Sequence, residues 1–308
     1  MTELHILQPG IASTIQDHGR QGTLHLGIPT AGAMDPYSLA AGRYRLGHQK
    51  NEAAIEIPYG NFIARPTESC EILVTGAPTE LHIDGEAVDP RNIQLLAKGQ
   101  TLAIGPTSRA VYCYLHIAGG IATKTFLGSR STSTREGIGG LDGRVLRAGD
   151  YIPLAKSSAT PRSPDPAMIV PVAPNMLRLR FVPGFQYDIL DGSARKALES
   201  NTFQVTSKSN RMGISLSGEP IETGIESLLS ESTCHGAIQI PPNGQPIVLM
   251  ADRQTVGGYP KPGAVIQSDC VRLAQARPGQ LVCFDVCTPM EADRIRWLEE
   301  NYLEERLC

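Results

Sequence analysis

The ten residues TELHIDGEAV, at positions 79–88, place an Asp-Gly pair between two short runs in which apolar and polar side chains alternate. Asp84 and Gly85 accept the positive φ angles of a tight two-residue turn, and an Asp-Gly pair between such runs is a strong hairpin signal. We therefore expect a β-hairpin, with residues 79–83 as one strand and residues 86–88 as the other. This hairpin makes an antiparallel, mainly β protein the first expectation.

Further strand signals recur along the sequence. The run LRLRF, at 177–181, alternates apolar and basic side chains, which places three on a core face and two in water. Gly-Gln or Gly-Asp pairs precede short alternating runs at 101–104, 151–154 and 281–286. The chain has 31 glycines and 23 prolines, above the roughly 12% that average usage gives for the two together. Such turn-rich sequence is typical of proteins built from many short strands.

Helices are expected at only a few places. Asp35 can cap a helix that has Pro36 at its first position and runs to residue 46, before Gly47. Thr288 and Glu291 form a capping box at the start of a C-terminal helix. A third, shorter helix is expected at 193–200. The predicted fold is mainly β, with a few short helices and a C-terminal helix.

A proline-rich stretch divides the sequence near its middle. Five prolines and three serines lie between residues 155 and 175, and proline suits neither a helix interior nor a central strand. We interpret residues 156–175 as a connector between an N-terminal β lobe (1–155) and a C-terminal β lobe (176–308). Two barrel-like lobes would account for the number of predicted strands.

Composition argues against several kinds of partner. Hydrophobic residues make up 41% of the 308 residues and charged residues 19%, which does not suit a disordered chain. The formal charge of −3 removes the electrostatic case for nucleic acid or an anionic membrane. No apolar stretch approaches the roughly 20 residues of a membrane span, and the first ten residues do not suit a signal peptide. The seven cysteines include no Cys-x-x-Cys, so we expect reduced thiols and a cytoplasmic location.

Several familiar catalytic motifs are absent from the sequence. It has no Gly-x-x-x-x-Gly-Lys-Ser/Thr loop, no Gly-x-Ser-x-Gly elbow and no His-Glu-x-x-His. Its histidines show no ligand spacing, so no metal site is expected. What remains are polar segments bounded by glycine.

The first of these segments lie in the N-terminal half, in QDHGR (16–20), GAMD (32–35) and LGSRST (127–132), the last followed by a glycine-rich stretch at 137–144. Their candidate binding residues are Gln16, Asp17, Arg20, Asp35, Arg130 and Ser131. Arginines among hydroxyl groups and bare backbone suit a carboxylate or a phosphate. A solvated glycine-rich loop without a ligand would explain the same composition.

The other segments lie in the C-terminal half, in SNRMG (209–213), IQIPP (238–242) and DRQTVGGYP (252–260). Their candidates are Arg211, Gln239, Asp252, Gln254, Gly257, Gly258 and Tyr259. A carboxylate, an amide and two glycines after a strand could cradle a small polar ligand. A hairpin loop whose Asp and Thr bond to their own backbone is the alternative.

Taken together, these segments carry a resemblance. TIQDHGR (14–20), GAMD, LGSRST, SNRMG, GAIQIP (236–241) and ADRQTVGGYP (251–260) resemble the biotin-dependent carboxyltransferase-like family known as allophanate hydrolase subunit 2. Members of that family include the C subunit of 5-oxoprolinase and the Kip antagonist protein. The matching segments run in order from residue 14 to residue 260, and RPG (277–279) fits the family's closing strand. Val256 departs from the pattern, which has a second Thr there.

The resemblance implies cyclophilin-like β-barrel lobes and, for a free-standing chain of this length, the role of the C subunit in a 5-oxoprolinase. That enzyme opens 5-oxoproline to L-glutamate with ATP hydrolysis. On this basis Asp252 and Gln254 are expected to orient the lactam, and Arg130, Arg211 and Arg20 to anchor a carboxylate or phosphate. Gly257 and Gly258 would allow close backbone approach. The remaining candidates are expected to contact the substrate.

The resemblance also implies partners and leaves two other functions open. Expected partners are a protein related to allophanate hydrolase subunit 1 (the B subunit of 5-oxoprolinase), together with the A subunit of 5-oxoprolinase, and either this chain or a partner would bind ATP. One alternative is carboxyl transfer to urea or another amide, with biotin supplied by a partner, because the chain has no Met-Lys-Met attachment sequence. The other is a regulatory binding protein like the Kip antagonist of a histidine-kinase inhibitor.

Overall fold

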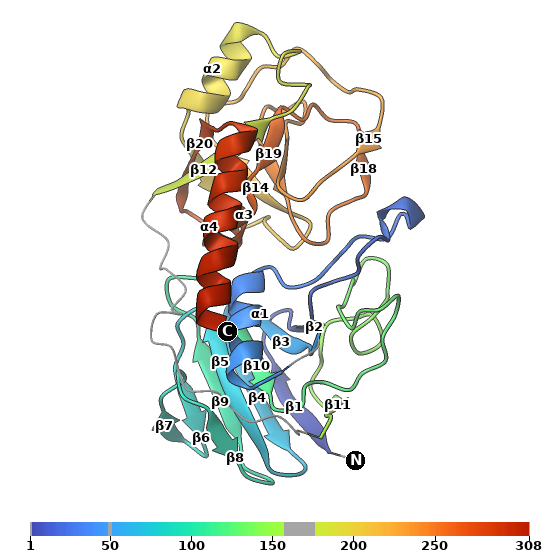
Figure 1. Ribbon diagram of the computed structural model, residues 1–308, viewed down its shortest axis with the longest axis vertical. Helices are drawn as coiled ribbons and strands as arrows, with labels where there is room; N and C mark the ends of the chain where they lie inside the picture. Colours follow the sequence, from blue (N-terminus) through green and yellow to red (C-terminus); the bar gives the residue numbers. More distant parts are fainter. Residues whose placement is uncertain (1, 49–50, 157–175, 308) are drawn as a thin grey trace. The chain divides into compact units, whose positions relative to one another are not determined.

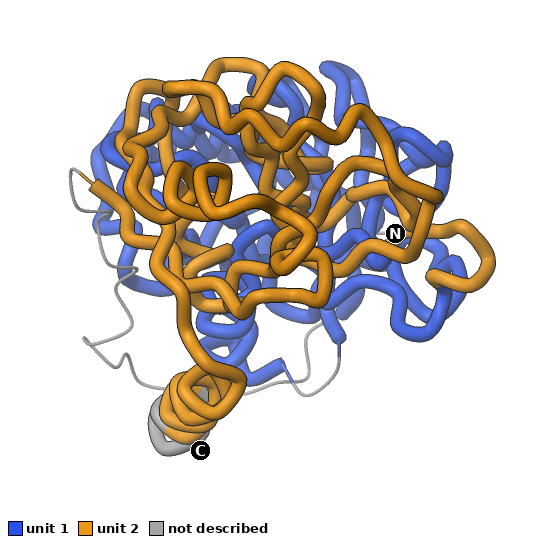
Figure 2. Tube along the Cα trace, turned by 90° about the horizontal axis from the view of Figure 1, so that it is seen from above, with its two compact units in different colours: residues 1–23, 30–172 blue, residues 24–29, 173–308 orange. Residues whose placement is uncertain are grey.

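Two compact units make up the chain in the computed structural model, which describes residues 2–48, 51–156 and 176–307. Unit 1 comprises residues 1–23 and 30–172, and unit 2 comprises residues 24–29 and 173–308 (Figure 2). The predicted connector, 156–175, lies outside the described residues except for residue 156. The predicted mainly β fold is confirmed, since short strands predominate in both units.

Unit 1 is built from two antiparallel sheets (Figure 1). In spatial order the first sheet contains β11 (Tyr151–Pro153), β1 (Glu3–Pro9), β4 (Gly60–Pro66), β9 (Leu102–Pro106), β6 (Leu81–Ile83) and β7 (Glu86–Val88). The second contains β2 (Thr14–Gln16), β3 (Ala54–Pro58), β10 (Tyr112–Ile117), β5 (Cys70–Gly76) and β8 (Gln94–Leu96). Buried side chains from both sheets, such as Leu4, Ile55 and Leu115, form one hydrophobic core.

The hairpin predicted at the Asp84-Gly85 pair is present. Leu81 pairs with Val88 and Ile83 with Glu86, so β6 and β7 are joined by Asp84 and Gly85 alone. Both turn residues have positive φ, 50° and 88°, which is the turn geometry that an Asp-Gly pair favours. The loop length therefore sets the register of this edge of the sheet.

Unit 2 contains a closed barrel. In spatial order its strands are β12 (Met176–Pro183), β19 (Gly263–Val265), β16 (Ala237–Gln239), β17 (Ile247–Leu249), β14 (Gly213–Ser217), β13 (Phe203–Val205) and β20 (Leu281–Val286). The barrel closes through a parallel pairing of β12 with β20. As the LRLRF pattern predicts, Leu177, Leu179 and Phe181 are fully buried. A separate pair of strands, β15 (Glu231–Ser232) and β18 (Val256–Gly257), also belongs to this unit.

The three predicted helices are present. They are α1 (Pro36–Arg45), α2 (Gly192–Ser200) and α4 (Pro289–Leu307). Thr288 and Glu291 form the expected capping box, in which the Glu291 N–H donates to Thr288 Oγ1 at 3.2 Å. No helix among the residues that the structure describes is both long enough and apolar enough to cross a membrane.

A fourth helix, α3 (Gln267–Ala274), is not among those that the sequence predicts. Its N-cap, Ile266, makes no side-chain capping bond, and six of its eight residues are buried. The sequence therefore carries no capping signal at the start of this helix. Tertiary packing against β12 stabilises it, as does the ion pair of its Asp269 with Arg180.

Candidate functional site

In unit 1, the carboxylate of Asp17 joins two of the predicted segments. Its Oδ1 accepts hydrogen bonds from Gly19 N at 2.8 Å, Ser129 Oγ at 2.5 Å and Ser131 Oγ at 2.6 Å. Its Oδ2 accepts from Arg130 N at 2.7 Å. A carboxylate offers about four acceptor positions, two on each oxygen, and four donors of the protein bond to it here, three of them to Oδ1. Asp17 is fully buried, so it holds segment 127–132 against segment 16–20.

The neighbouring candidates are also held by the backbone of these segments. Gln16 donates from Nε2 to Thr132 O at 3.1 Å, whereas its buried Oε1 has no hydrogen-bond partner among the described residues. The fully buried Arg20 donates from Nη2 to Ser131 O. Arg130 donates from Nε to Thr123 O at 2.9 Å. The structure thus brings five of the six N-terminal candidates together.

Glycines allow the stretch at 137–144 to pack directly on this cluster. A Cβ at Gly139 would lie 2.0 Å from Ser131 O, and a Cβ at Gly140 would lie 2.0 Å from Thr132 Oγ1. Both glycines have positive φ, a conformation that other residues rarely adopt. At these two positions the bare backbone that the sequence suggested for an anion is covered by the chain itself.

Asp35 lies in a different hydrogen-bond network of the same unit. Its carboxylate caps α1 by accepting from Ser38 N at 2.9 Å, and its own N–H donates to Tyr114 Oη at 2.8 Å. The Tyr114 hydroxyl donates to Glu56 Oε2 at 2.8 Å. Burial, with the charge of Glu56, raises the pKa of Tyr114 well above its ordinary value. Asp35 thus begins the helix, and this buried Glu-Tyr pair was missed because its residues carry no local motif.

His116, on β10, is a second buried polar group that the sequence did not single out. Thr75 Oγ1 donates to Ser38 O at 2.8 Å, so the 2.9 Å contact between Thr75 Oγ1 and His116 Nε2 has the imidazole as donor. Burial, helped by the nearby charge of Arg43, lowers the pKa of His116 to about 3. The ring is therefore neutral at physiological pH.

In unit 2, Arg211 and Asp252 form a bidentate ion pair. Arg211 Nε donates to Asp252 Oδ2 and Nη2 donates to Oδ1, both at 2.8 Å. The side chains are 15% and 6% exposed. The backbones also meet, since Asp252 N donates to Arg211 O at 2.9 Å. The pair joins the segment before β14 to the loop after β17.

A second set of candidates gathers at Gly257, in β18. Gln254 Nε2 donates to Gln239 Oε1 at 3.0 Å. Gln239 is 2% exposed, and its Nε2 has no hydrogen-bond partner within the described part of the chain. A Cβ at Gly257 would lie 2.6 Å from that nitrogen. This unpartnered buried donor is the feature of unit 2 that most resembles part of a binding site, because buried polar groups are normally bonded.

Three residues beside Gly257 were not predicted. Lys261 Nζ lies 2.9 Å from Glu231 Oε1 and 3.2 Å from Gly257 O. Gln186 Oε1 accepts from Lys261 N at 2.7 Å. Lys261 comes directly after the YP that ends the quoted motif, so its position was a usable signal. Gln186 and Glu231 are distant in sequence and could not be inferred from spacing.

The last candidates lie next to this set. Gly258 has no room for a side chain, because a Cβ there would lie 2.8 Å from Leu228 O. Tyr259 is 41% exposed and Val256, where the family pattern has Thr, is 56% exposed. Val256 in β18 and Tyr259 shortly after it therefore give this surface an apolar character.

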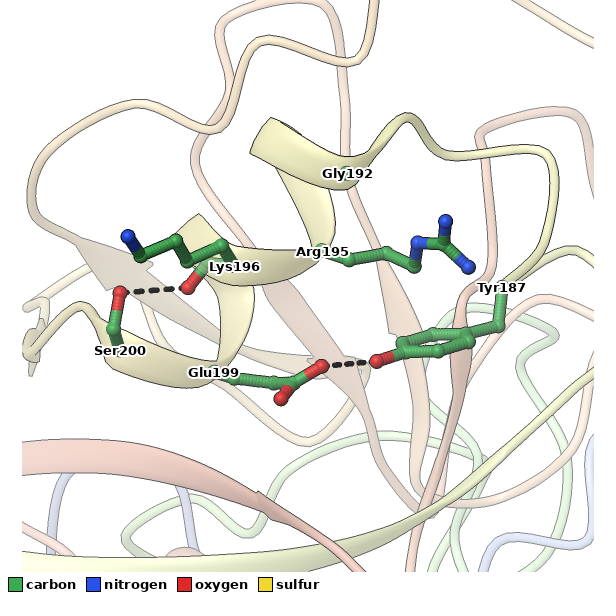
Figure 3. A pocket seen from close by; sticks show the side chains of 6 residues that line it. All are labelled: Tyr187, Gly192, Arg195, Lys196, Glu199 and Ser200. Carbon is green, nitrogen blue, oxygen red and sulfur yellow. Dashed lines mark hydrogen bonds between the residues drawn. The ribbon is translucent and has the colours of Figure 1, made fainter.

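A surface hollow of about 560 Å³ lies elsewhere in unit 2 and contains none of the predicted residues (Figure 3). It is lined by Tyr187, Gly192, Arg195, Lys196, Glu199 and Ser200. Tyr187 donates to Glu199, and burial together with that carboxylate raises the pKa of Tyr187 to about 12. The Arg195 guanidinium lies 5.6 Å from the centre of the Tyr187 ring. Tyr187, Glu199 and Arg195 are thus engaged with one another.

Comparison with known proteins places this chain in a family. The model of the carboxyltransferase domain, subdomains A and B, matches residues 26–286. The chain belongs to this family. The resemblance inferred from the six sequence motifs is thereby confirmed.

Relatives of this carboxyltransferase-domain chain include full-length matches. The C subunit of the 5-oxoprolinase of Escherichia coli strain K12 is 36% identical over 98% of this chain and 97% of its own length. The solved structure of TTHA0988 is 33% identical with a TM-score of 0.81, covering 92% of this chain and 55% of that one. The urea carboxylase of Kluyveromyces lactis has a TM-score of 0.90 at 21% identity, and this chain spans 29% of its length. That last likeness concerns the fold.

Proposed function

We propose that this chain is the C subunit of an ATP-dependent 5-oxoprolinase, a complex that opens 5-oxoproline to L-glutamate. The observation that carries the proposal is the 36% identity to the C subunit of E. coli, which extends over 98% of this chain and 97% of that relative. The match to a second such C subunit, from Haemophilus influenzae, has the same identity and the same coverage of both chains. Such end-to-end matches favour a shared role over a shared domain alone.

The proposed reaction explains why ATP is needed. A lactam is inert to water, and transfer of the γ-phosphoryl group to its carbonyl oxygen makes the ring carbon electrophilic. Water then attacks that carbon and the C–N bond breaks with a proton passing to the nitrogen, which leaves an acyl phosphate. A second water displaces phosphate from it, and the carboxylate of glutamate forms. The site must supply donors for negative charge on oxygen and an anchor for the substrate carboxylate.

Within this proposal the residues of unit 2 divide into two roles. The Arg211–Asp252 pair positions the loop that continues to Gln254, since both carboxylate oxygens are already bonded to Arg211. Gln254 and Gln239 present amide groups toward Gly257. Of the cationic candidates in unit 1, Arg130 is the one that is partly exposed, so we assign phosphate contact to it.

The proposal includes partner subunits and a cytoplasmic location. The name of the E. coli relative designates one component of a multi-subunit enzyme, and we assign the A and B subunits of 5-oxoprolinase as partners. In this proposal the assembled complex, rather than this chain alone, supplies the ATP site. This chain covers only 55% of TTHA0988, so that relative carries a further segment on the same polypeptide. We assign the corresponding role here to a separate partner protein. Six unbridged cysteines among the described residues support a reducing compartment.

The test is reconstitution with each component omitted in turn. Purified chain is mixed with the candidate A and B subunits, 5-oxoproline and ATP, and glutamate and phosphate are measured. Both products are expected only when all three proteins are present. Glutamate formation at the same rate without this chain would overturn the proposal. A stable complex that releases no glutamate would do so as well, and would favour a regulatory binding role.

Carboxyl transfer is a second candidate, because the family to which the chain belongs is defined by a carboxyltransferase domain. In that case biotin would arrive on a partner and the acceptor would be urea or another amide. The test supplies a biotinylated carrier protein, its carboxylase, ATP, urea and labelled bicarbonate. Label in a urea product that depends on this chain would support it, and unlabelled urea in every mixture would reject it.

A further inference from the structure

We propose that Gln239 recognises the edge of a cyclic amide through two parallel hydrogen bonds, with Gln254 as the residue that positions it and Lys261 as the counter-charge for a substrate carboxylate. The inference rests on the proposed function, since 5-oxoproline is a cyclic amide that carries a carboxylate. It differs from the sequence-based expectation, which assigned the lactam to Asp252 and Gln254.

The evidence begins with the hydrogen bonds of the Gln239 side chain. Its Oε1 accepts from Gln254 Nε2 at 3.0 Å, which fixes the orientation of the carboxamide. Its Nε2 is buried and has no partner among the residues described. A carbonyl oxygen has two lone pairs and a carboxamide nitrogen has two N–H groups. Gln239 therefore retains one acceptor position on Oε1 and its donors on Nε2, the two atoms at the end of one carboxamide.

A lactam is the chemical complement of such a pair. The ring holds its amide in the cis form, so that the N–H and the C=O point to the same side. A primary carboxamide can then donate to the lactam oxygen and accept from the lactam N–H at once. An ordinary trans amide points these groups in opposite directions, and glutamate, the opened product, has no amide there. The same contact would select the substrate and release the product.

Gly257 packs directly beside this amide. A Cβ at position 257 would lie 2.6 Å from Gln239 Nε2, so a side chain there would collide with that buried nitrogen. Gly257 is itself partly exposed. Val256 and Tyr259, beside it, are 56% and 41% exposed. These apolar surfaces suit the methylene groups of a small ring.

A positive charge also lies beside Gly257. Lys261 Nζ donates to Gly257 O at 3.2 Å and is paired with Glu231 at 2.9 Å. The Lys261 side chain is 10% exposed, and its backbone N–H is held by Gln186. A substrate carboxylate would take a place at this ammonium beside Glu231. The amide donor and the ammonium together match the two functional groups of 5-oxoproline.

The experiment separates recognition of the lactam from general damage. In the assembled complex without ATP, calorimetry measures the binding of 5-oxoproline and of its lactone analogue, in which ring oxygen replaces N–H. The wild type should bind the lactam at least about tenfold more tightly, the value of one lost hydrogen bond. Gln239→Met, similar in size but without an amide, loses both hydrogen bonds, so it should bind the lactam and the lactone equally and more weakly than the wild type binds the lactone.

Controls keep the result interpretable. Gln245→Met removes an amide that instead pairs with the N–H and C=O of Gly218 in the same unit, and it should keep the tenfold preference. Gln254→Met should reduce the preference severalfold while Gln239 remains, which tests the positioning role if Gln239→Met does not fold. A preference that survives in both Gln239→Met and Gln254→Met refutes this inference. If the wild-type complex neither binds nor opens 5-oxoproline, the proposed function itself fails.

Discussion

Replacement of Asp252 by Asn tests whether this carboxylate acts on the substrate or through Arg211. In the structure both of its oxygens accept hydrogen bonds from the Arg211 guanidinium at 2.8 Å. Asn keeps the size of the side chain but removes the charge and one acceptor. The backbone bond from residue 252 to Arg211 O, at 2.9 Å, does not depend on the side chain. The change therefore isolates the ion pair.

The expected loss of stability follows from the burial of this pair. Removing one partner of a buried ion pair costs about 3–5 kcal/mol. The Arg211 side chain is 15% exposed and Asp252 is 6% exposed, so water can reach the arginine in part and the lower end, about 3 kcal/mol, is expected. This is a large share of the about 5–15 kcal/mol that stabilises a typical domain. The double variant Arg211→Met with Asp252→Leu removes both charges and should recover most of the loss.

The assay must report on unit 2 by itself. Amide hydrogen exchange in increasing urea gives the free energy of opening for β14 and β17, which lie next to Arg211 and Asp252 in the sequence. Exchange in β3 and β10 of unit 1 is the internal control and should not change. Glutamate release by the reconstituted complex is measured for the wild type, the single variant and the double variant.

Two results would refute the reasoning. If Asp252→Asn changes the opening free energy of β14 and β17 by less than about 0.5 kcal/mol, the pair does not stabilise the loop as its geometry indicates. If the double variant recovers stability but releases glutamate no faster than the single variant, Asp252 or Arg211 acts on the substrate, as the sequence motifs predicted, and the purely positioning role is refuted. Recovery of both stability and glutamate release would establish the positioning role.

Three further predictions concern single residues. Burial lowers the pKa of His116 to about 3, so below about pH 6.5 the unfolded chain binds a proton there that the folded chain does not. The unfolding free energy of unit 1 should therefore fall by about 2 kcal/mol from pH 7 to pH 5. Urea titrations should show a smaller fall for His116→Gln. Gly42→Ala would place a Cβ 2.2 Å from His116 Nε2, which should lower the melting temperature and reduce the unfolding free energy by about 1–3 kcal/mol. Gly192→Ala, in open space at the start of α2, should be neutral or stabilising. Equal effects of the two changes would contradict the contact. Asp17→Asn disturbs an acceptor of four hydrogen bonds, so the unfolding free energy should fall by at least about 3 kcal/mol and proteolysis of segment 127–132 should be faster. Asp142→Asn, whose side chain is 77% exposed, should match the wild type in both measurements.

Local sequence patterns predicted the elements whose causes are local. The Asp84-Gly85 turn, the Asp35 helix cap and the Thr288 capping box depend on residues within four positions of one another. The alternation at 177–181 likewise decides which side chains face the barrel interior. Helix α3 was not predicted, because Ile266 at its N-cap gives no capping signal and its stability comes from tertiary contacts.

The sequence by itself determined the family, through short motifs spread from residue 14 to residue 260. It also determined which residue types were available for binding. It could not determine how those residues share their hydrogen bonds, because that depends on contacts between distant segments. Only the tertiary structure directs Asp17 to residues 129–131, Asp252 to Arg211, and Gln254 to Gln239. The sequence does not show that the oxygens of a carboxylate are bonded within the chain, or that an amide keeps a donor without a partner. The folded structure shows both.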